Sequence, residues 1–269
     1  MKQLILSLSI ILSSTLYSQV SMQELLKSNF RNRDVAAEVN VKEEMDRFNN
    51  SINWDRVDGW STLEEYLERD HIYPNIHPHY LHLSHVINAL DIETLLNPTI
   101  GYGAGRVPKF IYAQNPNLKI TCLDPNSFNR ELMRENFQIR TDVIPPNIRI
   151  PAAIKKGATH NLSQFKDNSF DMVFTCQSMM HLPFIAAVHA AKEMARVSKK
   201  YVLHIENKNV GPHWYNRVIS KPASMHDINY QAIDYDAVYK KLGFETLINY
   251  EYKDPYSEGI YICYLGKKK

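Results

Sequence analysis

The sequence predicts an α/β domain built on a doubly wound sheet of seven strands, most of them parallel. Beyond residue 90, short apolar runs alternate with helical runs, a glycine-rich turn follows the first apolar run, and no helix separates the last two. Strands that alternate with helices pair in parallel, whereas two strands joined by a short turn pair antiparallel. We therefore expect a mostly parallel sheet that ends in a C-terminal antiparallel hairpin.

The expected elements cover most of the second half of the chain. The apolar runs that indicate strands are residues 94–100, 119–123, 152–156, 172–175, 201–205, 246–250 and 260–265. The helical runs are residues 107–114, 127–139, 184–196 and 234–242. Because the carboxyl ends of parallel strands share one edge of a sheet, we expect the binding site at that edge.

The N-terminus carries a short hydrophobic segment. Lys2 precedes an apolar stretch that ends near Leu16, and small or polar residues follow up to Gln19. This pattern is typical of a secretory signal peptide, although a segment that is not cleaved and a true start at Met22 are alternatives. We expect a signal-like segment at 1–19, a helical N-terminal extension or cap at 20–89, and the α/β domain at 90–269.

Composition limits the partners and the compartment. The formal net charge is +2, with 31 Lys and Arg against 29 Asp and Glu, so we expect no nucleic-acid partner. The hydrophobic segment is too short for a stable membrane span. The three cysteines lie in strand-like runs, which favours buried thiols and the cytoplasm, while export follows if residues 1–19 are a signal peptide. Nothing in the sequence indicates the oligomeric state.

A histidine-rich stretch precedes the first strand. It includes His77, His79, His82 and His85, whose spacing alone suggests a metal site. No cysteine or acidic side chain joins them, and prolines interrupt a common helical face, so we expect no metal there.

The turn after the first strand favours a nucleotide ligand. Gly101, Gly103 and Gly105 allow the backbone to approach a ligand, and the following helix offers unpaired N–H groups at its N-terminus. The second strand ends at Asp124, whose carboxylate is placed to accept hydrogen bonds from two ribose hydroxyls. A nicotinamide dinucleotide is disfavoured, because Arg106 stands where that motif requires a small residue.

Further motifs follow in a consistent order, namely residues 168–174, 179–182, 193–197 and Gly243-Phe244. Together with the glycine turn and Asp124, they make residues 90–265 resemble the class I S-adenosylmethionine-dependent methyltransferases. The resemblance implies a Rossmann-like fold and S-adenosylmethionine as cofactor.

The resemblance also implies roles for individual residues. Asp124 would hold the ribose and Pro125 would lie beside the adenine. The residues expected near the methionine part are Gly101, Tyr102, Gly103, Gly105, Cys176 and Gln177, and those expected at the adenine ring are Ala158 and Thr159.

The methyl acceptor implied by the family is an unidentified small molecule. His181 is a candidate base or orienting group, with a structural histidine as the alternative. Glu206, at the end of the fifth parallel strand, is either a catalytic group in contact with the acceptor or a carboxylate that bonds backbone. The candidate substrate-binding residues are Tyr80, His213 and Trp214.

The chain departs from the family pattern at three places. Thr99 and Gly157 stand where acidic residues are usual, and Ser198 begins a turn where Pro-Gly-Gly is usual. These departures, with residues 1–19, motivate an alternative, an exported or catalytically degenerate binding protein that keeps the fold.

Overall fold

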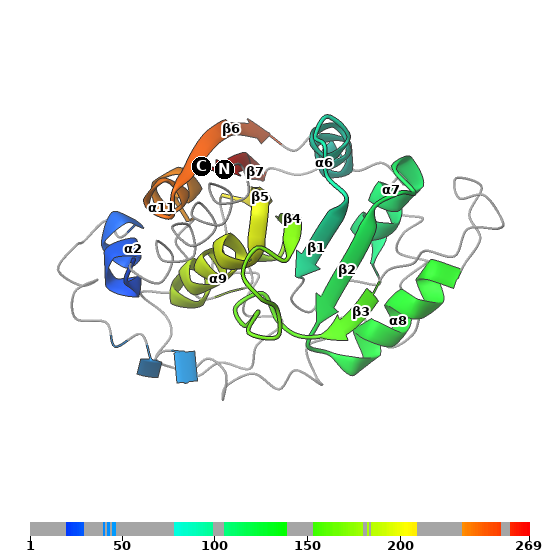
Figure 1. Ribbon diagram of the computed structural model, residues 1–269, viewed down its shortest axis with the longest axis horizontal. Helices are drawn as coiled ribbons and strands as arrows, with labels where there is room; N and C mark the ends of the chain where they lie inside the picture. Colours follow the sequence, from blue (N-terminus) through cyan, green and yellow to red (C-terminus); the bar gives the residue numbers. More distant parts are fainter. Residues whose placement is uncertain are drawn as a thin grey trace, which may run out of the picture.

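The computed structural model describes residues 20–29, 40, 42–43, 45–46, 78–98, 105–138, 153–179, 182, 184–208, 233–253 and 259–269. The described strands form a seven-stranded sheet in the order β3-β2-β1-β4-β5-β7-β6 (Figure 1). Their bounds are β1 Thr94–Pro98, β2 Lys119–Asp124, β3 Ala153–Lys156, β4 Phe170–Cys176, β5 Ser198–Asn207, β6 Phe244–Lys253 and β7 Ile260–Lys268.

The pairing of the strands confirms the predicted fold class. Strands β1 to β5 pair in parallel, and β7 pairs antiparallel with both β5 and β6. The chain runs outward from β1 through β2 to β3 and then crosses back to β4 on the other side of β1. Such a reversal of strand order opens a crevice beyond the carboxyl ends of the strands, where open α/β sheets bind their ligands.

Helices cover both faces of the sheet (Figure 1). One face carries α2 (Met22–Asn29), α9 (Phe184–Val197) and α11 (Tyr235–Lys241), whose apolar side chains form one core cluster with the sheet. The other face carries α6 (Pro78–Asn88), α7 (Arg106–Gln114) and α8 (Ser127–Gln138), which form a second cluster.

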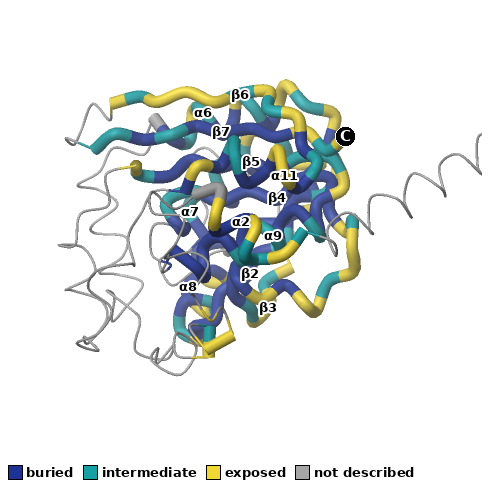
Figure 2. The backbone as a smooth tube through the Cα atoms, turned by 90° about the vertical axis from the view of Figure 1, so that its left-hand side faces the viewer, coloured by how far each residue is buried: buried dark blue, intermediate teal, exposed yellow. Residues whose placement is uncertain are grey.

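Successive side chains of a strand point to opposite faces of the sheet and so contribute to both core clusters. Adjacent residues Leu95 and Leu96 are both fully buried, and they belong to opposite clusters. The central strands are buried on both faces, whereas β6 at the edge alternates between covered and exposed positions (Figure 2). Continuous apolar runs are therefore the expected signal for the centre of this sheet.

Most strands are longer than their apolar runs, and the extension is largest in β5 and β6. β5 begins at Ser198 and β6 ends at Lys253, because polar residues at these ends also join the backbone ladder. Residues 99 and 100, predicted to end the first strand, lie outside the described part of the chain.

The N-terminal helix α2 is docked on α9. Ser21 caps it, since the Ser21 backbone N–H donates to Glu24 Oε2 at 2.8 Å and the Glu24 N–H donates to Ser21 Oγ at 3.2 Å. Lys192 Nζ of α9 donates to the Val20 carbonyl at 2.6 Å, and Leu25 is fully buried. Among the described helices, none has the length and hydropathy that a membrane span requires. Residues 1–19 lie outside the described part.

Candidate functional site

Gly105 begins α7, the helix that follows β1 in the chain. It is the N-cap of α7, has a φ of 75°, and provides no side-chain cap. A Cβ atom there would lie 2.7 Å from Phe137 Cε1, so both the left-handed backbone and the packing of α8 require glycine. The first N–H groups of α7 lack a side-chain cap from this residue, and such groups are suited to an anionic ligand.

Asp124 ends β2 and is fully buried. Its Oδ1 accepts the Asn126 backbone N–H at 2.8 Å, and Asn129 Nδ2 lies 3.5 and 3.4 Å from its two oxygens. A carboxylate has about four acceptor positions, which suits this group type to the hydroxyls of a ribose. Burial and, as the smaller cause, the negative charge of Asp124 raise the pKa of the Cys122 thiol to about 12.

The turn that follows Asp124 is held at several points. Asn126 Oδ1 accepts the Asn129 N–H at 3.2 Å and thereby caps α8. Arg130 Nη1 donates to the carbonyls of Asp124 and Pro125 at 2.9 and 2.8 Å. The position of the carboxylate is therefore fixed by its own turn and by the first turns of α8.

The stretch after β3 is tied to two strand ends. Thr159 Oγ1 donates to the carbonyl of Pro98 at 2.8 Å, and the Gly157 N–H lies 3.4 Å from the Asp124 carbonyl. Thr159 is fully buried and Ala158 is nearly so. These bonds bring the predicted adenine-contacting stretch to the same edge as the end of β1 and the turn after β2.

The end of β4 contributes Cys176 and Gln177. Burial raises the pKa of the Cys176 thiol well above its usual range, and the charge of Glu206 raises it further, so the thiol stays protonated. Gln177 has a φ of 53°, a left-handed conformation that costs a residue other than glycine about 1–2 kcal/mol. Backbone strain of this kind concentrates at functional sites and persists only where surrounding contacts enforce it.

Glu206 lies at the same edge, near the end of β5. Its side chain is 2% exposed, and its two carboxylate oxygens accept the backbone N–H groups of Ser178 and Met179 at 3.2 and 3.1 Å. Of the two roles expected for Glu206, the bonding of backbone is therefore the one with contacts in the structure.

No role was predicted for a buried polar network that lies below this edge. His204 Nδ1 and Thr175 Oγ1 are 2.7 Å apart, and His204 Nε2 and Tyr239 Oη are also 2.7 Å apart. Tyr235 stacks on the imidazole with ring centroids 4.2 Å apart. Burial lowers the pKa of His204 to about 3, so the ring is neutral. A histidine inside an otherwise apolar strand was the signal that could have indicated it.

The histidines of α6 contact tyrosines of the terminal hairpin. His79 is hydrogen-bonded to Tyr252, and His82 Nδ1 lies 2.8 Å from Tyr250 Oη. Tyr80, predicted to bind substrate, packs against Phe110 of α7 with ring centroids 5.7 Å apart. Within the described residues, no cluster of His, Cys, Asp or Glu has the arrangement of a metal site.

The described part of the edge therefore brings together Gly105, Asp124, Pro125, Ala158, Thr159, Cys176, Gln177 and Glu206. Six predicted site residues lie outside the described ranges and remain predictions, namely Gly101, Tyr102, Gly103, His181, His213 and Trp214.

Residues 99–205 match the family model described as "Methyltransferase domain". The matched segment includes the turn after β2, the stretch after β3, the end of β4 and most of β5, but it stops one residue before Glu206. No curated protein sequence matches the chain.

Solved structures share the fold. A SAM-dependent methyltransferase from Methanosarcina mazei has 17% identity and a TM-score of 0.50, over 68% of this chain and 96% of that one. TehB from Haemophilus influenzae has 14% identity and a TM-score of 0.51, over 77% and 68%. The [4+2]-cyclase SpnF has 15% identity and a TM-score of 0.50, over 70% and 80%. Likeness at such identities shows a common fold and not a common reaction.

Proposed function

Because the α/β domain belongs to the class I S-adenosylmethionine-dependent methyltransferase family, we propose that this chain binds S-adenosylmethionine and transfers its methyl group to a small-molecule acceptor. The observation that carries the proposal is the convergence at one sheet edge of a fixed carboxylate, Asp124, with the α7 N-terminus and the Ala158-Thr159 stretch. Each belongs to the segment that matches the family.

The residues present fit the parts of this cofactor. The α7 N-terminus offers N–H groups to the methionine carboxylate. Asp124 would accept from the ribose hydroxyls, and the stretch at Ala158 and Thr159, which is buried at the same sheet edge, would lie beside the adenine. Cys176 and Gln177 line the methionine side, with the thiol neutral and unable to compete for the methyl group as a thiolate.

The chemistry asks mainly for alignment. The bound cofactor supplies a methyl group on a sulfonium, which is already electrophilic. The protein must then hold the acceptor in line with the S–CH₃ bond and exclude water from the crevice. We propose that His181 orients the acceptor or takes its proton, and that Tyr80, His213 and Trp214 contribute to the acceptor pocket.

Calorimetry with S-adenosylmethionine tests the proposal without knowledge of the acceptor. We expect saturable binding to the intact chain, and a loss of at least about 1.5–3 kcal/mol of binding free energy in Asp124→Ala, since charge-assisted hydrogen bonds are worth that much. Glu251→Gln, an exposed carboxylate on β6, is the control and should bind as the wild type does.

A second measurement separates a folding defect from a binding defect. Asp124→Asn keeps an oxygen that can accept the Asn126 N–H but removes the charge, so we expect weakened binding with little loss of stability. Absence of S-adenosylmethionine affinity in the wild-type protein would overturn the proposal and favour a binding protein that keeps only the fold.

A further inference from the structure

Three consecutive backbone N–H groups after β4 are held by β5. Gln177 donates to the Ile205 carbonyl at 2.9 Å, and the next two residues, Ser178 and Met179, donate to the two oxygens of Glu206. The turn after β4 thus continues the ladder between the two strands by one bond and then replaces it with the Glu206 side chain.

The first residue of this turn has an unfavourable backbone. Gln177 is one of two described residues other than glycine with a positive φ, and the following two N–H groups are those bonded to Glu206. A left-handed conformation at a glutamine requires neighbours that enforce it. The Glu206 carboxylate is 2% exposed and is bonded immediately after the strained residue, which suits it to that task.

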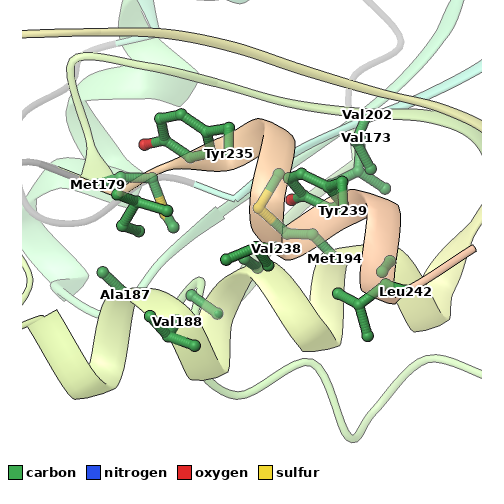
Figure 3. Packing of buried hydrophobic residues seen from close by; sticks show 14 of the residues in the cluster. Val173, Met179, Ala187, Val188, Met194, Val202, Tyr235, Val238, Tyr239 and Leu242 are labelled. Carbon is green, nitrogen blue, oxygen red and sulfur yellow. The ribbon is translucent and has the colours of Figure 1, made fainter. Parts of the chain in front are cut away.

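Only an ionised carboxylate suits both donors. A glutamine at this position would present one oxygen and one amide NH₂ group, so that one of the two backbone N–H groups would face another donor. The charge of Glu206 also acts on its surroundings, because burial and then Glu206 raise the pKa of Tyr235 well above its usual range. Tyr235 and Met179 lie at the same end of the packed cluster in Figure 3.

We propose that Glu206 is a positioning residue for cofactor binding: by holding the N–H groups of Ser178 and Met179, it fixes Gln177 in the conformation that receives the methionine part of S-adenosylmethionine. The inference rests on the proposed function, and it replaces the acceptor-contact role for Glu206. Loss of Glu206 should therefore change the affinity for the cofactor, which can be measured without an acceptor.

The test is calorimetry of the full chain with S-adenosylmethionine and with S-adenosylhomocysteine. We expect Glu206→Gln to weaken both affinities about tenfold, equivalent to about 1.4 kcal/mol. Tyr239→Phe is the matched control: it removes a buried hydrogen bond to His204 but none of the three bonds that hold the turn, so it should lower the unfolding midpoint while leaving both affinities unchanged. Equal loss of affinity in both variants would show a general structural effect and overturn the proposal.

A substitution at Gln177 distinguishes positioning by Glu206 from a merely structural role. Asparagine tolerates the left-handed region better than glutamine, so Gln177→Asn reduces the need for enforcement by Glu206. We expect Glu206→Gln to weaken binding about tenfold in the wild-type background and less than about threefold in the Gln177→Asn background. The same loss in both backgrounds would contradict positioning through Gln177.

The measurements distinguish a failure of the proposed function from a failure of this inference. Wild-type protein without affinity for S-adenosylmethionine would remove the proposed function and this inference together. Binding by the wild type and equal binding by Glu206→Gln would remove only the inference. If Glu206→Gln does not fold, Glu206→Asp keeps the charge but shortens the reach; folded protein with unchanged affinity would then overturn the proposal, and weakened affinity would support it.

Discussion

Two histidine–tyrosine pairs lie on opposite faces of the sheet and differ in their access to water. His204 and Tyr239, on the face covered by α9 and α11, are fully buried, with 2.7 Å between Nε2 and Oη. His82 and Tyr250, on the face covered by α6, have a similar separation of 2.8 Å, but Tyr250 is 40% exposed. The bonds are alike in length, so any difference in their energetic value comes from the surroundings.

The difference shows that burial decides what such a bond contributes. Water can replace a lost partner at Tyr250, whereas a lost partner at His204 leaves a polar atom unsatisfied in the core, which costs about 1–3 kcal/mol. Burial also lowers the pKa of His204 to about 3. The pKa of His82 is lowered as well, by burial and then by His85.

The largest effect is expected from removal of the buried imidazole. His204→Leu leaves the hydroxyls of Thr175 and Tyr239 without their shared partner, so we expect the free energy of unfolding to fall by about 2–5 kcal/mol. Urea denaturation measures it. The matched change His82→Leu should cost about 1 kcal/mol or less, and an equal cost for both would break the comparison.

The loss of folding stability at acid pH should depend in part on the buried His204. A histidine with an ordinary pKa of 6.5 and a folded-state pKa of about 3 stabilises the fold fully above pH 6.5. That contribution is lost as the pH falls from 6.5 toward 3, by up to about 1.4 kcal/mol per pH unit.

His204→Leu should therefore flatten the fall in stability between pH 6.5 and 4 relative to wild type. His160, whose pKa burial and then His189 lower to about 4, should keep part of the slope in both proteins. Denaturation midpoints at several pH values check this. An unchanged slope in His204→Leu would mean that the imidazole is not held neutral by the fold.

The smallest effect is expected at the exposed pair. Tyr250→Phe removes the hydroxyl that contacts His82, and water replaces it at the surface, so we expect about 1 kcal/mol or less. The unfolding midpoint is the measurement. A loss as large as that of His204→Leu would show that α6 depends on this contact more than its exposure indicates.

The sequence predicted the elements well where apolar residues mark them. The run at 119–123 became β2 (Lys119–Asp124), and the run at 260–265 marks most of β7. The ends of β5 and β6 were missed because Lys199 and Glu245 give no apolar signal, although their backbones pair with neighbouring strands or continue the strand. Periodicity reports which side chains are covered, not how far a ladder extends.

The site was less predictable, for a geometric reason. The sequence could place Glu206 at the end of a strand, but no local pattern indicates that its carboxylate bonds the backbone that follows a left-handed Gln177. His204 lay inside an apolar run and received no role, since its partners Thr175 and Tyr239 come from separate elements. Pairings between distant segments are set by the tertiary structure, which a single sequence does not reveal.

The cap and one docking bond of helix α2 come from residues that precede its first residue, Met22. A polypeptide initiated at Met22 would begin at the first residue of this helix, without the Ser21 hydroxyl that accepts the Glu24 N–H and without the Val20 carbonyl that receives Lys192. It would instead place a protonated amino group at the positive end of the helix dipole. Such a chain would hold α2 on α9 without that cap and without the bond from Lys192.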